Sequence, residues 1–405
     1  MIIKNIYGGV CAAKGFTAAG IHCGIRANKS KKDLALIKSE VPASAAATYT
    51  TNIVKGAPIY VTQKNISNGK AQAILVNSGN ANTCNANGIE IAEGMCSLLE
   101  KHSGISASDV IVASTGVIGQ VMTLKPFEAN MAQLVSSLGD NSKDAAAAIM
   151  TTDTIEKELA VTFKIDGKIC CMGGIAKGSG MINPNMATML VFLTTDVAIS
   201  SKMLQKALSA DVKDSFNMIS VDGDTSTNDM CSILANGMAG NTEITADGSD
   251  FDIFCQALNT VTTYLCRSIA KDGEGATKLL ECTVSGADSK EKASIIAKSV
   301  IKSNLLKAAM FGADANWGRV LCAIGYSGVS VDISKIDVAF ASSVGKIEVC
   351  QNGTGLDFCE ATAKKILLED EIIIYISLHE GTQSATAWGC DLTYDYVKIN
   401  GDYRS

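Results

Sequence analysis

The chain of 405 residues is poor in the residues that build metal centres: it has only three histidines and no Cys-x-x-Cys pair. His22, His102 and His379 lie far apart in the sequence, so no zinc site is expected. The fourteen cysteines are scattered. They are typical of small buried apolar residues in a reducing cytosol rather than of a disulfide framework.

Charge and long apolar runs are also scarce. Charged residues make up 19% of the chain, the net charge is −6, and no stripe of lysine and arginine occurs. This composition disfavours nucleic-acid binding. No run approaches the roughly 18 apolar residues of a membrane span. Small residues and glycines interrupt residues 1–20, unlike a signal peptide. We therefore expect a soluble cytoplasmic protein.

Hydrophobic residues, at 47%, are abundant enough for a large core, and the length allows two or three domains. Short apolar runs alternate with segments of helical spacing, which predicts a layered α/β fold. We expect strands at 71–76, 109–113, 189–194, 346–350 and 371–378. We expect helices over 88–101, 124–138, 201–216 and 250–269, and another that ends at 301 and starts with a capping box of Asp288 and Glu291.

The most informative segment is Lys177–Leu190, which combines glycines, an Asn183-Pro184 turn and a single threonine before an apolar strand. A tight loop of this kind brings backbone close to a hydroxyl, as an enzyme needs if it cuts its own chain and then uses the freed threonine as a nucleophile. Taken alone, Thr188 is far more typical of a β-branched residue that starts a strand.

This segment resembles the processing site of the ornithine acetyltransferase family, also called glutamate N-acetyltransferase, whose ArgJ-type members act in arginine biosynthesis. Further stretches match the family in the same order along almost the whole chain. They are Gly8–Val10 with Lys14–Phe16, Asn77–Asn82, Ser114–Gly119, Met150–Thr154, Asp222–Asp229, Gly312–Arg319 and Tyr396–Asn400.

The resemblance implies cleavage between Ala187 and Thr188, which would give an α chain of residues 1–187 and a β chain of residues 188–405. Cleavage would free an α-amine with a reference pKa of about 8, and this amine could take the hydroxyl proton of Thr188. The resemblance also implies an αββα sandwich, like that of self-processing aminopeptidases, over residues 1–280. A smaller α/β domain over residues 281–405 would follow.

The resemblance implies roles for seven further residues. Thr115 and Gly116 would form the oxyanion hole, with a hydroxyl and a backbone N–H as donors. The residues that would contact substrate are Thr151, Lys177, Glu274, Asn400 and Ser405. Without the resemblance, Thr115 and Gly116 are typical of a strand-to-loop turn, and Lys177 and Glu274 of solvated loop residues. The C-terminal residues are typical of a frayed chain end. Loops 77–82 and 222–229 stay outside the catalytic set, because polar turns explain them equally well.

The activity implied is transfer of the acetyl group from N2-acetyl-L-ornithine to L-glutamate through an acetyl-threonine intermediate, with no metal or organic cofactor. The family also implies a heterotetramer of two α and two β chains. The sequence does not decide whether acetyl-CoA is a second donor. Two alternatives stay open: an N-terminal-nucleophile amidohydrolase or aminopeptidase that releases the acyl group to water, and a non-catalytic ligand-binding protein with an intact chain.

Overall fold

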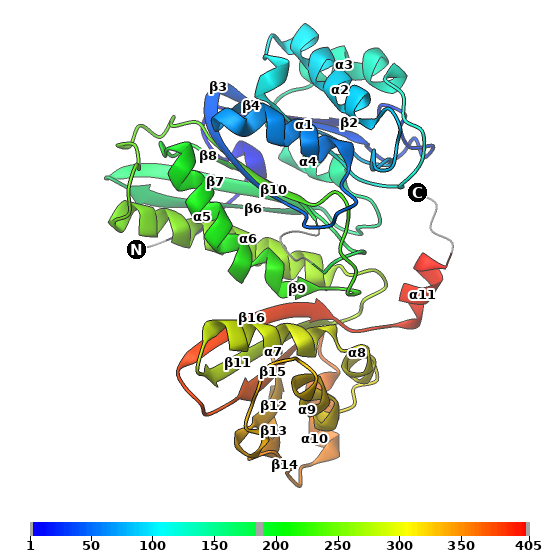
Figure 1. The fold of residues 1–405 in the computed structure, drawn as a ribbon, viewed down its shortest axis with the longest axis vertical. Helices are drawn as coiled ribbons and strands as arrows, with labels where there is room; N and C mark the ends of the chain where they lie inside the picture. The colour runs from blue at the N-terminus through cyan, green and yellow to red at the C-terminus, as the bar shows by residue number, and fades with distance from the viewer. Residues whose placement is uncertain (1–2, 184–188, 402–405) are drawn as a thin grey trace.

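The computed structural model describes residues 3–183 and 189–401. Within these ranges the larger part of the fold is built on a sheet of nine strands, in the order β1-β6-β7-β8-β10-β3-β4-β5, with β2 paired to β3 (Figure 1). The strands are β1 Lys4–Ile6, β2 Phe16–Ile21, β3 Leu34–Tyr49, β4 Lys70–Asn77, β5 Val110–Ser114, β6 Lys157–Ile165, β7 Lys168–Lys177, β8 Leu190–Thr195 and β10 Met230–Ala235.

The long strand β3 joins two layers of this sheet. Its first half, from Leu34, pairs with β2 and β4, whereas residues 44–49 pair with β10. Side chains from both layers meet in one buried cluster, together with the alanines and Ile149 of α4 (Ser142–Ile149). Alternate residues of a strand face opposite sides. In β8, accordingly, Phe192 lies in the inner cluster and Val191 in the outer one.

Helices cover both outer faces, which gives the expected αββα sandwich (Figure 1). On the face of β2–β5 lie α1 Ala57–Asn65, α2 Gly88–Ser103 and α3 Lys125–Ser136. On the face of β6–β10 lie α5 Ser201–Asp214 and α6 Ser249–Lys271. Each fully buried leucine, isoleucine or phenylalanine in these clusters contributes about 1.5–3 kcal/mol.

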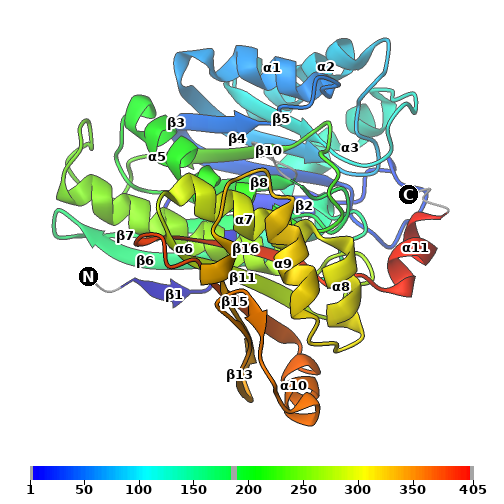
Figure 2. The same cartoon turned by 60° about the horizontal axis from the view of Figure 1, so that its bottom comes forward.

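A second sheet, of seven strands within the described ranges, forms the smaller part, in the order β14-β13-β12-β15-β11-β16-β9. Its strands are β9 Ile219–Ser220, β11 Leu279–Ala287, β12 Asp337–Ser342, β13 Gly345–Gln351, β14 Thr354–Gly355, β15 Glu371–Ser377 and β16 Gln383–Cys390. Its helices are α7 Lys290–Lys302, α8 Asn304–Phe311, α9 Trp317–Gly325 and α10 Glu360–Leu367. Figure 2 shows β13 and α10 at the end farthest from the larger sheet.

The two parts share a hydrophobic core. Helix α6 packs against β11 and β16, and one buried cluster includes side chains from both sheets. Strand β9 precedes β10 in the sequence but pairs with β16 of the second sheet. The final helix, α11 (Tyr394–Asn400), returns to the larger part beside the loops at the strand ends (Figures 1 and 2).

The strands and helices predicted from periodicity are present, with ends shifted by at most two residues. One detail was wrong: the N-cap of α7 is Ser289, whose hydroxyl accepts the N–H of Lys292, and not Asp288. The sequence prediction missed several elements, among them β3. Half of this 16-residue strand is alanine, serine and threonine, and it has no clear period. No helix in the described ranges is long and apolar enough to cross a membrane.

Candidate active site

A pocket lies where loops from the larger sheet meet the loop after α6 and the final helix. It gathers six of the residues expected at the site, which come from five separate segments: Thr115 and Gly116, Thr151, Lys177, Glu274, and Asn400. Ala187, Thr188 and Ser405 fall outside the described residues. The neighbouring strand is described: β8 begins at Leu190, which pairs with Lys177 across the antiparallel β7–β8 ladder.

The Thr115–Gly116 turn is shaped by close contact with the loop after β4. Gly116 has φ +128, and a Cβ built on it would lie 2.3 Å from the carbonyl carbon of Gly79. Only glycine fits this conformation and this approach. The N–H groups on either side are used, Thr115 donating to Asn77 O and Val117 to Gly79 O. The Gly116 N–H and the Thr115 hydroxyl donate to no residue in the described ranges, so both are available to a ligand.

Lys177 places a buried cation in the pocket wall. Lys177 is only 8% exposed. Its ammonium makes no hydrogen bond within residues 3–183 and 189–401. Burial lowers the pKa of Lys177, and the nearby carboxylates of Asp153, Asp229 and Glu274 oppose this shift. A buried ammonium without a hydrogen-bonded partner favours an anionic ligand, such as a carboxylate.

Three buried charges under the pocket fix its floor. The Lys157 ammonium lies 2.8 Å from Asp153 Oδ1 and 2.5 Å from Asp272 Oδ2. Asp153 also accepts the N–H groups of Thr151 and Gly178. Burial acts to raise the pKa of Asp153, but Lys157 and Lys177 hold it below its ordinary value. The network therefore positions Thr151 and the first residue after Lys177.

Sequence reasoning missed this network. Asp153 lies inside the Met150–Thr154 stretch, but its i,i+4 spacing to Lys157 indicates an ion pair only within a helix, and Lys157 begins strand β6. No sequence signal pointed to Asp272, which is 115 residues from Lys157.

Glu274 and Asn400 meet in the wall of the same pocket. The Asn400 amide donates a hydrogen bond of 2.7 Å to Glu274 Oε2. The Glu274 N–H donates to Ser179 O at 2.9 Å. A Cβ on Gly180 would lie 2.3 Å from the Glu274 carboxylate, so a larger residue there would displace the Glu274 side chain. Glu274 is 8% exposed, which makes it a buried anion on the pocket surface and not an acid in a flexible turn.

The loop before β10 also lines the pocket, through Ser226, Thr227 and Asn228. This loop was left outside the site in the sequence analysis. The Asn228 amide donates to Ala81 O and Ser114 O, and its oxygen accepts the Thr83 hydroxyl. Asn228 therefore ties the loop after β4 and the end of β5, which precedes the Thr115–Gly116 turn, to the start of β10.

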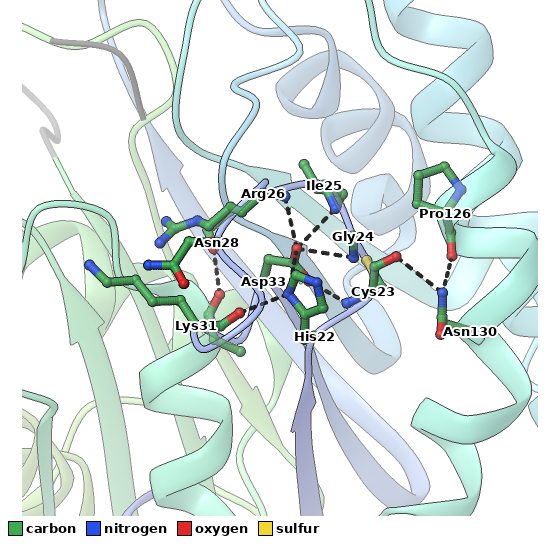
Figure 3. Close-up of polar contacts among 12 residues, drawn as sticks. His22, Cys23, Gly24, Ile25, Arg26, Asn28, Lys31, Asp33, Pro126 and Asn130 are labelled. Carbon is green, nitrogen blue, oxygen red and sulfur yellow. Dashed lines mark hydrogen bonds and ion pairs between the residues drawn. The ribbon is translucent and has the colours of Figure 1, made fainter.

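A further buried carboxylate, that of Asp33, supports the chain beside the pocket. Asp33 accepts the N–H groups of Cys23, Gly24, Ile25 and Arg26, which wraps residues 22–33 into a compact turn (Figure 3). The turn aims Arg26, whose guanidinium donates to Met150 O. Met150 immediately precedes Thr151, so this contact fixes the chain beside a pocket residue.

The geometry provides hydroxyl and N–H donors, a buried cation and a buried acid around one small pocket. No group of three or more histidine, cysteine, aspartate or glutamate side chains within the described ranges is placed to hold a metal ion. Such a pocket can bind a small zwitterion with an extra charge and stabilise a developing oxyanion.

Comparison with known proteins gives a family for this chain. It is 52% identical over 392 residues to the arginine biosynthesis bifunctional protein ArgJ 1 of Clostridium acetobutylicum, over 96% of each chain. It is 49% identical over 394 residues to ArgJ of Caldanaerobacter subterraneus subsp. tengcongensis, over 97% of each. A crystal structure of ArgJ from Bacillus halodurans matches with a TM-score of 0.51 at 47% identity, covering 53% of this chain and all of that one. A profile of the ArgJ family matches residues 17–405, and the chain belongs to the ArgJ family.

Proposed function

We propose that this protein is a self-processing acetyltransferase of arginine biosynthesis that moves an acetyl group from N2-acetyl-L-ornithine to L-glutamate through Thr188. The observation that carries the proposal is the pocket itself. It joins free oxyanion donors, a buried cation and a buried acid at the edge where β7 ends and β8 begins. Full-length similarity to ArgJ proteins supports the pathway.

Self-cleavage is the first step of the proposed mechanism. The Thr188 hydroxyl attacks the Ala187 carbonyl carbon, the amide C–N bond breaks, and the hydroxyl proton moves to the nitrogen. Water then hydrolyses the resulting ester, which leaves a carboxylate on Ala187 and a free hydroxyl and α-amine on Thr188. The amine is the base that a threonine nucleophile needs.

The length of a solved relative is in keeping with this cleavage. The Bacillus halodurans ArgJ chain corresponds to 53% of this chain. A product of residues 188–405 would hold 218 of the 405 residues, about 54%. The two products would stay together, because β7 and β8 form neighbouring strands of one sheet on either side of the cut.

Acetyl transfer follows. As the Thr188 oxygen attacks the acetyl carbon, the α-amine takes its proton, and the oxyanion lies against the Thr115 hydroxyl and the Gly116 N–H. The donor C–N bond then breaks, the leaving nitrogen takes the proton held by the α-amine of Thr188, and ornithine departs. The neutral amine of glutamate then attacks the acetyl ester, and the Thr188 oxygen leaves with the proton that this amine loses.

Two charged groups would hold the substrates. Lys177 pairs with the α-carboxylate that ornithine and glutamate share. Glu274 pairs with the side-chain ammonium of ornithine, and the Asn400 amide orients Glu274. Thr151 and Ser405 complete the proposed contacts.

The proposal extends to an assembly of two α and two β chains, which rests on the family resemblance alone. It also extends to acetyl-CoA as a second donor, in keeping with the word bifunctional in the names of the relatives. Light scattering on the purified protein measures the assembly. Formation of N-acetylglutamate from acetyl-CoA and glutamate, without acetylornithine, measures the second activity.

The direct test is a denatured intact mass of purified protein incubated with N-acetylornithine. Two fragments that meet at Thr188, with one acetyl group on the C-terminal fragment, would support processing, nucleophile and donor together. Two fragments without acetyl, and acetate released at the same rate with and without glutamate, would favour an amidohydrolase. A single unmodified chain from folded protein would favour a ligand-binding protein.

A further inference from the structure

The connection between β9 and β10, residues 221–230, holds the chain on both sides of residues 184–188. On the upstream side, the Asp222 carboxylate accepts the N–H of Met181 at 2.6 Å and the N–H of Ile182 at 2.9 Å. Next to it, the Val221 N–H donates to Ile182 O at 2.7 Å. One carboxylate and one backbone pair thus fix the direction in which residues 181–183 run.

A second pair of bonds follows at Asn183. Its side-chain amide donates to Gly223 O at 2.9 Å, and its carbonyl accepts the Thr225 hydroxyl at 2.9 Å. Asn183 is 8% exposed. Asp222 and Thr225 therefore act on consecutive parts of the same short segment.

The downstream side is held by the same connection. The Met230 N–H donates to Met189 O at 2.9 Å, and β10 then runs parallel to β8 from the pair Met230–Leu190. Both strands are fully buried. Both ends of the five residues between Asn183 and Met189 are therefore fixed to one continuous stretch of backbone.

The connection is itself supported from the smaller part of the fold. The buried ammonium of Lys307, in α8, donates to Val221 O. The Asp224 N–H donates to Asp222 Oδ1 at 3.2 Å. This bond orients the Asp222 carboxylate toward the Met181 and Ile182 N–H groups.

We propose that Asp222 is a positioning residue for cleavage between Ala187 and Thr188. The inference rests on the proposed self-cleavage and adds a residue to it. Attack of a hydroxyl on the preceding carbonyl requires the two groups to be held in near-attack geometry, and small misplacements cost large factors in rate. After cleavage, residues 181–187 are no longer bonded to Thr188. Asp222 therefore affects processing more than acetyl transfer.

The test measures the rate of processing in full-length protein made by cell-free translation, from the ratio of intact to cleaved chain on denaturing gels. Asp222→Asn keeps the shape but removes the charge and one acceptor, so one of the two N–H groups loses its partner. We expect cleavage to slow by about tenfold to a hundredfold. Asp224→Asn, the same change at an exposed carboxylate two residues away, should cleave within about twofold of the unchanged protein.

A second variant and a second readout separate positioning from folding. Thr225→Val removes the hydroxyl bond to Asn183 at nearly constant volume, and it should also slow cleavage. Acetyl transfer per cleaved molecule should stay within about threefold in both variants, whereas a purely structural defect would lower it together with the melting temperature.

The outcomes are distinct. Asp222→Asn and Thr225→Val that are cleaved as fast as the unchanged protein would overturn the role of Asp222 and leave the self-cleavage proposal standing. An unchanged protein that stays intact, or a Thr188→Ala variant that is still cleaved at this bond, would overturn the self-cleavage proposal and the inference with it.

Discussion

The side-chain amide of Asn400 donates a 2.7 Å hydrogen bond to the carboxylate of Glu274, although 126 residues separate them. The bond joins the last helix, α11, to the loop after α6 at the edge of the pocket. It completes one wall of the pocket with a segment that comes from the far end of the chain.

Removing the charge of Glu274 should affect the two substrates unequally. We expect Glu274→Gln to raise KM for N-acetylornithine by about tenfold or more, because an ammonium group loses a buried anionic partner. KM for glutamate should change much less. Asn400→Leu should give a weaker effect in the same direction, because Glu274 stays but loses its orienting bond. Steady-state kinetics with each substrate varied in turn checks this. Equal changes for both substrates would contradict the assignment.

Replacing the proposed nucleophile should stop both reactions. Thr188→Ala lacks the hydroxyl, so we expect an intact 405-residue chain and at least about a thousandfold loss of kcat. Thr188→Ser is the matched control, because it keeps the hydroxyl and should retain part of both activities. Intact mass and a transfer assay measure the two outcomes. A cleaved and active Thr188→Ala protein would rule out this nucleophile.

The oxyanion donors are tested at Thr115. Thr115→Val removes the hydroxyl and keeps the side-chain volume. We expect kcat to fall by about a hundredfold to a thousandfold with little change in KM, because the donor acts on charge that develops in the transition state. Thr115→Ser should recover most of the rate. A rise in KM at unchanged kcat would instead assign Thr115 to ground-state binding.

The lowered pKa of Lys177 gives a pH dependence. Burial favours the neutral amine, so Lys177 loses its charge at a lower pH than an ordinary lysine does. KM for both substrates should therefore rise as the pH increases through this lowered pKa. In Lys177→Met, KM should already be raised at neutral pH and this rise should disappear. The comparison is made by measuring KM against pH for the unchanged protein and for Lys177→Met. If KM rises with pH in the same way in both, Lys177 does not contact the substrate carboxylate.

The buried network under the pocket should matter for stability. Lys157→Met leaves Asp153 and Asp272 without their cation, and we expect a loss of about 3–5 kcal/mol in the free energy of unfolding. Lys206→Met, at an exposed ion pair with Asp247, is the control and should cost less than about 1 kcal/mol. Urea unfolding of both variants measures the difference.

The same network predicts acid sensitivity with a definite sign. The pKa of Asp153 is held below its ordinary value in the folded protein. Its contribution to stability is therefore fully present above the pKa of an unfolded aspartate and is lost as the pH falls toward the folded value. Unfolding free energies measured from neutral to acidic pH should show this loss in the unchanged protein. The loss should be smaller in Lys157→Met.

Much of the fold could be predicted from periodicity. Helix α6 and strand β4 follow from spacings of three and four and from a short apolar run, because burial on one face selects these patterns directly. Strand β3 could not be found this way. Its two halves pair with different layers, and both of its faces are buried over most of its length. Its sequence therefore shows no alternation of apolar and polar residues.

The sequence by itself determined which residues could carry the chemistry. It supplied the threonine in its glycine-rich segment and, through the family resemblance, the Thr115–Gly116 turn. With only three histidines, it also predicted an α-amine as the base. Only the tertiary structure decided that Lys177, Glu274 and Asn400 share one pocket. Only the structure revealed the contact between Asp222 and residues 181–182. These relationships join segments from 40 to 126 residues apart. Local spacing encodes which face of an element is buried, but packing alone determines which loops meet.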